Sequence, residues 1–278
     1  MKRHASDPRR IWWCATGPLA FLPIHAAGIY ASGQDHTAED CLSNYAISSY
    51  IPTITTLVGR TKEVNQRGPT KLLLISQPNT RGQKPIPGVK IEVDKIFRNL
   101  TGRGLEAKCL EDSAATVDDV KKMMESHSWI HFACHGSQNT QSALQSTFYL
   151  HDGELMLTEI IKKQLINADL AFLSACQTST GEEKLSEEAV HLAGGMLAAG
   201  YRGVVATMWS IMDRYGPEIA VDFYKYILNS AKTSEGGNEL NTDMAAYALH
   251  YATGCIRKKL GDSESGLLAW VPYVHFGY

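Results

Sequence analysis

A long hydrophobic run is missing from this sequence of 278 residues, since no eighteen consecutive positions are uninterruptedly apolar. A membrane-spanning helix needs about 20 predominantly apolar residues, so we expect no membrane span. An excess of positive charge is missing too, because the formal net charge at pH 7 is -2. Proteins that bind nucleic acid carry a basic patch or stripe, so nucleic acid is not an expected partner.

Short motifs that mark several enzyme classes are also missing. The sequence has no G-x-S-x-G elbow, no G-x-x-x-x-G-K-[ST] phosphate loop and no H-E-x-x-H zinc motif. Its six cysteines stand far apart without a C-x-x-C pair, so a structural zinc site is not expected. Several cysteines lie in apolar runs, which indicates free thiols in a reducing compartment. We expect a cytoplasmic protein with no metal and no organic cofactor.

The N-terminal segment has some features of a signal peptide. Basic residues precede an apolar stretch at 11–28, but Pro18, Pro23 and His25 interrupt that stretch. The interruptions favour a strand, a turn and a second apolar segment over a secretory leader. Residues 1–9 are assigned to an N-terminal tail. Core-like sequence begins only a few residues after the first residue, so we interpret the chain as the last part of a longer protein.

The rest of the sequence alternates strand-like and helix-like patterns. Alternation of this kind predicts a mostly parallel sheet with helices on both faces, and near-continuous apolar strands are typical of a sheet covered on both sides. The predicted fold class is therefore α/β, with an N-terminal segment at 10–69 and a core at 70–278. Strands are expected at 71–76, 105–110, 129–133, 169–175 and 203–209, a hairpin at 148–157, and helices at 88–100, 116–126, 158–165, 186–200, 216–231 and 244–260.

Two further segments have weaker signals. The sequence EGGNEL at 235–240 is predicted to be a loop. The last residues, WVPYVHFGY at 270–278, are predicted to form an edge strand, because Pro272 lacks the N–H that a central strand needs.

Reactive side chains follow three of the predicted strands. His135 follows WIHFA, Cys176 follows DLAFLSA, and Asp213 comes shortly after GVVATMW. Ligand sites of open α/β sheets gather at the carboxyl ends of the strands. A hairpin and a helix separate His135 from Cys176, which is the interval that adjacent parallel strands require. We therefore expect an imidazole, a thiol and a carboxylate at one edge of the sheet.

A thiol beside an imidazole is suited to attack on an amide carbonyl. A free cysteine with a pKa of about 8.5 is only about 3% thiolate at pH 7, and a nearby imidazole raises that fraction. The backbone N–H groups of Gly136 and Cys176 are the predicted oxyanion donors. The plain alternative is that Cys176 is a core thiol, as many cysteines in apolar runs are. His131 is interpreted as a hydrogen-bonded core histidine and Cys134 as a buried thiol.

Several long motifs, in one order, resemble the CHAT domain. They include HFACHGSQ, LAFLSACQTSTGEE, EEAVHLAGGMLAAGYRGVVATMWSIMD and the terminal WVPYVHFGY, and the resemblance runs from about Arg10 to Tyr278. CHAT domains are similar to the caspase, separase and gingipain group of cysteine proteases. The resemblance implies a caspase-like α/β/α sandwich over 10–278, with 70–278 as the catalytic core. It also implies an endopeptidase with His135 as base and Cys176 as nucleophile of a thioester acyl-enzyme.

The resemblance further implies substrate contacts. MWSIMDR resembles a separase run in which an acid helps to hold a basic P1 side chain, so Asp213 is a candidate S1 acid. Its plain alternative is a helix cap. Ser174 and Trp209 are the other candidate substrate contacts. Metacaspases carry an aspartate at the position of Ser174, which puts any transfer from that branch in doubt.

The resemblance also implies partners. CHAT domains usually follow helical repeats such as tetratricopeptide repeats, and some relatives activate gasdermin-like pore formers in immunity or cell death. We therefore expect a protein substrate, with such a pore former as one candidate, and regulatory repeats in a longer chain. Two alternatives stay open. The domain could be a catalytically idle scaffold or adaptor for protein–protein interaction, or a transpeptidase or ligase that uses the same dyad.

Overall fold

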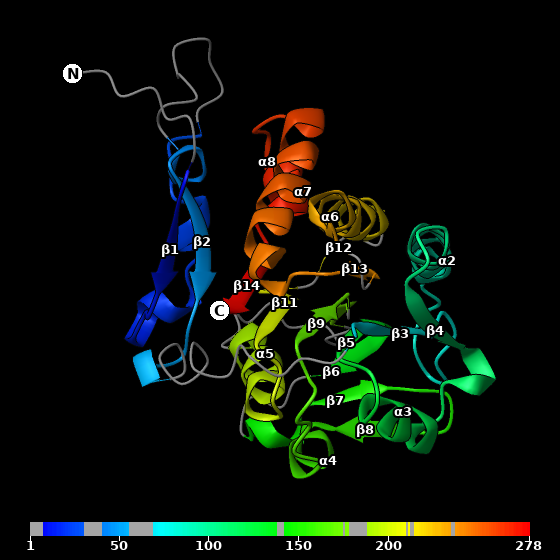
Figure 1. Ribbon diagram of the computed structural model, residues 1–278. Coiled ribbons are helices and arrows are strands. Elements are labelled where there is room, and N and C mark those ends of the chain that lie inside the picture. The colour runs from blue at the N-terminus through cyan, green and yellow to red at the C-terminus, as the bar shows by residue number, and fades with distance from the viewer. Residues whose placement is uncertain are drawn as a thin grey trace.

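The structure is a computed structural model in which an eight-stranded sheet lies between two layers of helices (Figure 1). The strand order is β1-β2-β14-β11-β9-β5-β3-β4. This architecture confirms the predicted α/β fold with a mostly parallel sheet. The residues that the structure describes are 8–30, 41–55, 69–137, 142–174, 176–177, 188–209, 211, 214–234 and 237–278.

Five parallel strands form the centre and one end of the sheet. They are β3 (Lys71–Ser76), β4 (Glu106–Glu111), β5 (Trp129–Ala133), β9 (Leu170–Leu173) and β11 (Gly203–Thr207). Successive side chains enter opposite cores: Leu72 and Leu74 belong to one hydrophobic cluster, and Leu73 and Ile75 belong to the other. The near-continuous apolar strands are thus explained by helices on both faces.

The helices divide between the two faces (Figure 1). On one face lie α2 (Gly88–Thr101), α6 (Gly216–Ser230), α7 (Ala245–Leu260) and α8 (Glu264–Trp270). On the other lie α3 (Val117–Met124), α4 (Leu157–Lys162) and α5 (Glu188–Ala198). Every helix in the described part of the chain is too short or too polar to cross a lipid bilayer.

Helix ends follow local chemistry. The side chain of Thr116 accepts a hydrogen bond from Asp119 N, and two acids in the first turn favour the start of α3. Gly200 follows α5 with a φ of +122°, and a Cβ there would lie 2.5 Å from the carbonyl oxygen of Leu165. Only glycine fits that turn without strain. Short 3-10 helices occupy Gly17–Phe21, Ile24–Ala26, Leu42–Asn44, Asp112–Ala114, Ala143–Gln145 and Thr242–Met244.

The C-terminal strand β14 (Tyr273–Gly277) lies inside the sheet, so the prediction of an edge strand is wrong. It pairs antiparallel with β11 and parallel with β2 (Ala46–Tyr50), which in turn pairs with β1 (Arg9–Trp13). Pro272 precedes the strand, so its missing N–H interrupts no ladder. The N-terminal segment and the core therefore share one sheet.

Two other differences concern short elements. Within the segment predicted as a loop, β13 (Gly237–Glu239) pairs with β12 (Lys232–Ser234) as a small hairpin. The helix α8 has no counterpart in the prediction, although its start has a sequence signal. The side chain of Ser263 caps it by accepting from Gly266 N.

A second, four-stranded sheet lies beside the main one, with the order β10-β6-β7-β8. Its strands are β6 (His135–Ser137), β7 (Thr147–Tyr149), β8 (Glu154–Met156) and β10 (Cys176–Gln177). The pair β7–β8 confirms the predicted hairpin. The strands β6 and β10 continue two strands of the main sheet and carry the predicted dyad.

Candidate active site

The two strands of the predicted dyad leave the main sheet and pair again. One residue, Cys134, separates β5 from β6, and two residues separate β9 from β10. The strands β6 and β10 are parallel, and His135 is the register partner of Cys176. Neighbouring strands lie about 4.8 Å apart. The fold therefore brings the backbones of these two residues side by side from positions far apart in sequence.

His135 is fully buried and has one ring nitrogen engaged. Its Nε2 lies 2.7 Å from the carbonyl oxygen of Lys84. A carbonyl oxygen only accepts, so Nε2 carries the proton and Nδ1 of the neutral ring is unprotonated. Among the described residues, Nδ1 has no hydrogen-bond partner. The ring is therefore held in the tautomer that leaves Nδ1 able to accept a proton.

The loop that supplies the Lys84 carbonyl runs from the end of β3 to the start of α2. Gln77 N donates to the carbonyl oxygen of Ala133 at 2.9 Å, and Ile86 N donates to that of Pro78 at 3.0 Å. Sequence reasoning missed this contact with His135 because any residue type can offer a backbone carbonyl. No side-chain pattern would have revealed it.

A buried carboxylate joins three further residues just below the strand ends. Ser174 Oγ donates to Glu92 Oε2 at 3.1 Å, and His131 Nε2 lies 2.9 Å from Glu92 Oε1. Glu92 and His131 are 1% and 0% exposed. We call Glu92, His131 and Ser174 the Glu92 cluster. Burial, followed by the charge of Glu92, raises the pKa of Tyr224, whose hydroxyl lies 3.4 Å from His131 Nδ1.

His131 is thus a core histidine with polar partners, as interpreted from the sequence, and one of those partners is an acid. Sequence reasoning missed Glu92. The available signal was its position in the helical pattern, three residues after Val89 and four before Ile96, both of which are buried. An acid on the buried face of a helix requires a partner inside the protein.

The structure describes the other predicted site residues only in part. Asp213 lies outside the described residues, and of Cys176 only the backbone is described. Gly136 pairs with Gln177 on one side and with Phe148 on the other. Trp209 follows β11, is half-buried and packs against both hydrophobic clusters. The roles of these residues in catalysis or substrate binding stay predictions.

Cys134, which separates β5 from β6, is fully buried in the cluster of α3, α4 and α5. Burial raises the pKa of its thiol far above the ordinary value. Burial also raises the pKa of Cys109, to about 11, with Glu111 adding to the effect. Both thiols are therefore poor nucleophiles near neutral pH. Among the described residues, no three His, Cys, Asp or Glu side chains gather in a way that would hold a metal ion.

A family comparison decides the membership of the chain. The family model described as the CHAT domain matches residues 2–278. The chain belongs to the CHAT domain family. No curated protein matches it.

Solved structures similar to this CHAT domain support the fold. The Arg-specific cysteine proteinase gingipain R matches with a TM-score of 0.51, 16% identity, and coverage of 84% of this chain and 55% of that one. The separase–securin complex of Saccharomyces cerevisiae matches with a TM-score of 0.53, 16% identity, and coverage of 85% and 14%. The CHAT domain thus spans about half of gingipain R and a small part of separase. At these identities the likeness concerns the fold.

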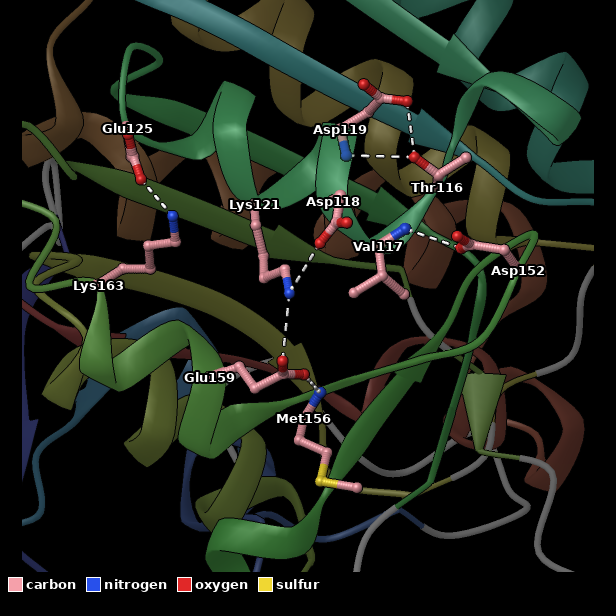
Figure 2. A network of polar contacts seen from close by, with 10 residues as sticks. All are labelled: Thr116, Val117, Asp118, Asp119, Lys121, Glu125, Asp152, Met156, Glu159 and Lys163. Atoms are coloured by element: carbon pink, nitrogen blue, oxygen red, sulfur yellow. Dashed lines mark hydrogen bonds and ion pairs between the residues drawn. The ribbon is translucent and has the colours of Figure 1, made fainter.

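In this CHAT domain, polar contacts tie the hairpin β7–β8 and α4 to α3 (Figure 2). Lys121 Nζ lies 3.1 Å from Asp118 Oδ1 and 3.2 Å from Glu159 Oε1. Val117 N, at the start of α3, donates to Oδ1 of Asp152 in the turn of the hairpin, at 2.8 Å. Because β6 pairs with β7, these contacts support the small sheet that carries His135.

Proposed function

We propose that this CHAT domain is a cysteine endopeptidase in which His135 is the base and Cys176 is the nucleophile. The observation that carries the proposal is the register of β6 and β10, which makes the two residues direct neighbours. The unprotonated Nδ1 of His135, which has no partner among the described residues, supports the same assignment.

The reaction begins when His135 Nδ1 takes the proton of the Cys176 thiol and the thiolate attacks the carbonyl carbon of the scissile peptide bond. The backbone N–H groups of Gly136 and Cys176 donate to the oxyanion, a contribution of about 3 kcal/mol for each donor. The tetrahedral species then collapses. The C–N bond breaks, the leaving amine takes the proton from His135, and a thioester remains on Cys176.

Hydrolysis regenerates the enzyme. His135 removes a proton from water, which attacks the thioester carbonyl, and the returning proton restores the thiol as the carboxylic acid leaves. Through both half-reactions Nε2–H can keep its hydrogen bond to the Lys84 carbonyl, because the proton moves on and off at Nδ1. That bond also stabilises the charged imidazolium while it exists.

The substrate of the proposed reaction is a protein. Gingipain R, which is similar in fold, is named as Arg-specific, and the separase structure contains a protein partner, securin. In our proposal Asp213 is the acid that pairs with a basic P1 side chain, and Trp209 lines the same pocket. A gasdermin-like pore former as substrate, regulatory tetratricopeptide-like repeats and a cytoplasmic location stay predictions.

A cleavage profile against a peptide library tests the proposal. The wild-type chain is compared with Cys176→Ala, Asp213→Ala and the control Cys134→Ala. We expect Cys176→Ala to lose all cleavage, Asp213→Ala to lose cleavage after Arg and Lys, and Cys134→Ala to cleave as the wild type does. Cleavage that persists in Cys176→Ala contradicts the dyad, and unchanged cleavage at basic sites in Asp213→Ala contradicts the S1 assignment. Transfer of the acyl group to an added amine, without hydrolysis, favours a transpeptidase.

A further inference from the structure

The strand that carries Cys176 changes sheets over a very short distance. Leu173, the last residue of β9, pairs with Phe132 in the main sheet, and Cys176 pairs with His135 in the small one. Ser174 begins the connection between them. It is buried, and its Oγ donates to Glu92 Oε2 at 3.1 Å. The backbone of the chain is therefore anchored two residues before Cys176.

The strand that carries His135 has an anchor on the same carboxylate. His131 lies in β5, four residues before His135, and its Nε2 is 2.9 Å from Glu92 Oε1. The His131 ring also stacks on Phe172 of β9, with the ring centroids 5.0 Å apart. One carboxylate thus contacts both strands just before each of them reaches its residue of the dyad.

The helix that carries Glu92 is itself firmly seated. Its residues Val89, Val93 and Ile96 are buried in the hydrophobic cluster of α2, α6 and α7. The loop that leads into this helix supplies the carbonyl of Lys84 that binds His135 Nε2. The helix and its leading loop therefore touch the site at three points, which are Ser174, His131 and His135.

We infer that Glu92 is a positioning residue, which sets the spacing between His135 and Cys176 by holding Ser174 and His131. The inference rests on the proposed function, because it concerns the geometry of that dyad. A direct contact with a P1 side chain is disfavoured, since Glu92 is 1% exposed, its Oε2 accepts from Ser174 and its Oε1 lies 2.9 Å from His131 Nε2. A displacement of about 1 Å between reacting groups can slow a reaction by as much as about 100-fold.

The test measures alkylation of Cys176 by iodoacetamide as a function of pH, with the labelled residue identified by mass spectrometry. Glu92→Ala leaves a cavity among buried polar groups and threatens folding, so the variants remove single contacts. Ser174→Ala removes the anchor before Cys176. Glu92→Gln keeps an acceptor for Ser174, and its amide NH2 can donate to His131 Nε2 once the ring proton moves to Nδ1, which faces the Tyr224 hydroxyl. Thr253→Val is the matched control, because it removes a buried hydroxyl that donates within α7, to the carbonyl oxygen of Leu249 at 2.9 Å.

We expect Ser174→Ala to slow alkylation of Cys176 at pH 7 by roughly tenfold and to move the midpoint of its pH profile up toward about 8.5, the value of an ordinary thiol. Glu92→Gln should keep the wild-type midpoint, and so should Thr253→Val. Thermal unfolding is followed in parallel, because lost stability alone lowers Tm without moving that midpoint.

Three outcomes overturn the inference while leaving the proposed function intact. The first is a wild-type midpoint and rate in Ser174→Ala. The second is an equal change in Ser174→Ala and Thr253→Val. The third is normal alkylation together with a loss of cleavage confined to one P1 class, which assigns Ser174 to the substrate pocket. If Cys176 of the wild-type chain reacts no faster than its other thiols, the proposed function fails, and the inference fails with it.

Discussion

The two ends of the central strands differ in how their polar groups are used. At the amino ends, Asp169 accepts from Trp129 Nε1 at 3.1 Å, from Thr242 Oγ1 and from Arg202 Nη1 at 3.4 Å. At the carboxyl ends, His135 Nδ1, Gln77 Oε1 and Ser76 Oγ have no partner among the described residues. We call Asp169, Trp129, Arg202 and Thr242 the amino-end cluster.

The difference indicates that the amino ends of the strands stabilise the fold and that the carboxyl ends carry the reactive groups. A buried acid whose donors come from several elements fixes those elements relative to one another. An unpartnered buried nitrogen costs stability and persists where a proton or ligand is to be bound. Arg202 Nε at the amino ends also lacks a hydrogen-bond partner among the described residues, but the sites of open α/β sheets lie at the carboxyl ends of the strands, where the unpartnered His135 Nδ1 is found.

The largest expected effect comes from the carboxyl end. His135→Ala should lower kcat/KM for peptide cleavage by roughly 10²- to 10⁴-fold, the usual contribution of a general base. Tm should fall by less than in Asp169→Ala, because His135→Ala removes one neutral hydrogen bond, from Nε2 to the Lys84 carbonyl, and breaks no ion pair. Steady-state kinetics and calorimetry on the same preparation check both parts. If His135→Ala is unfolded at room temperature, the main role of His135 is to stabilise the fold.

The amino end should give the opposite result. Asp169→Ala leaves Arg202 buried with a lost partner, and breaking a buried ion pair from one side costs about 3–5 kcal/mol. With roughly 2–4 °C of Tm per kcal/mol, Tm should fall by about 10 °C. Cleavage per folded molecule should stay within about twofold at a temperature where the variant is folded. If Asp169→Ala loses cleavage while its Tm is unchanged, the amino ends of the strands contribute to the reaction, which contradicts the comparison.

Stability should also depend on pH through histidines outside the site. Burial lowers the pKa of His25 to about 4, and burial with the charge of Arg10 holds the pKa of His275 well below its usual range. In the unfolded chain these histidines bind protons near pH 6.5, so the unfolded state gains protons first as pH falls. The contribution of these two histidines to the free energy of unfolding should therefore be largest above about pH 6.5 and should decline as the pH falls from there toward 4.

Urea unfolding at several pH values measures that decline. His25→Gln keeps an amide donor toward the Val271 carbonyl, which His25 Nε2 approaches at 2.9 Å, but cannot titrate. The variant should lose part of the slope between pH 6.5 and 4. An unchanged slope in His25→Gln would assign the pH dependence to other groups.

The smallest effect is expected from the contacts of Figure 2. Lys121→Met keeps an apolar stem and removes the contacts with Asp118 and Glu159. Pairs of this exposed kind contribute at most about 1 kcal/mol and are screened by salt. Urea unfolding at low and high salt checks this, with Lys225→Met as the matched control, since Lys225 pairs with Asp222 on α6. A tenfold loss of cleavage would show that support of the hairpin matters to the site.

Sequence reasoning predicted the fold that the structure has, and it singled out His135 and Cys176, whose strands pair in the structure. Apolar runs that alternate with helical spacing were sufficient for β3, β5, β9 and the helices between them, because both faces of the sheet are covered. The position of β14 was missed, since pairing partners far apart in sequence leave no local pattern. Lys84 was missed because it acts through its backbone. Glu92 was missed because its partner His131 lies in another element, β5, which is separated from α2 by β4 and α3.

Site-resolved labelling by an electrophilic peptide tests whether His135 and Cys176 form a catalytic dyad. Cys134 precedes His135 in the chain and Cys176 is the register partner of His135, so the two thiols form an internal comparison within one molecule. We expect Cys176 to be modified first at pH 7, Cys134 to stay unmodified in the folded chain, and His135→Ala to remove the preference. Equal or slower modification of Cys176, or a preference that survives His135→Ala, would contradict a catalytic dyad in this CHAT domain.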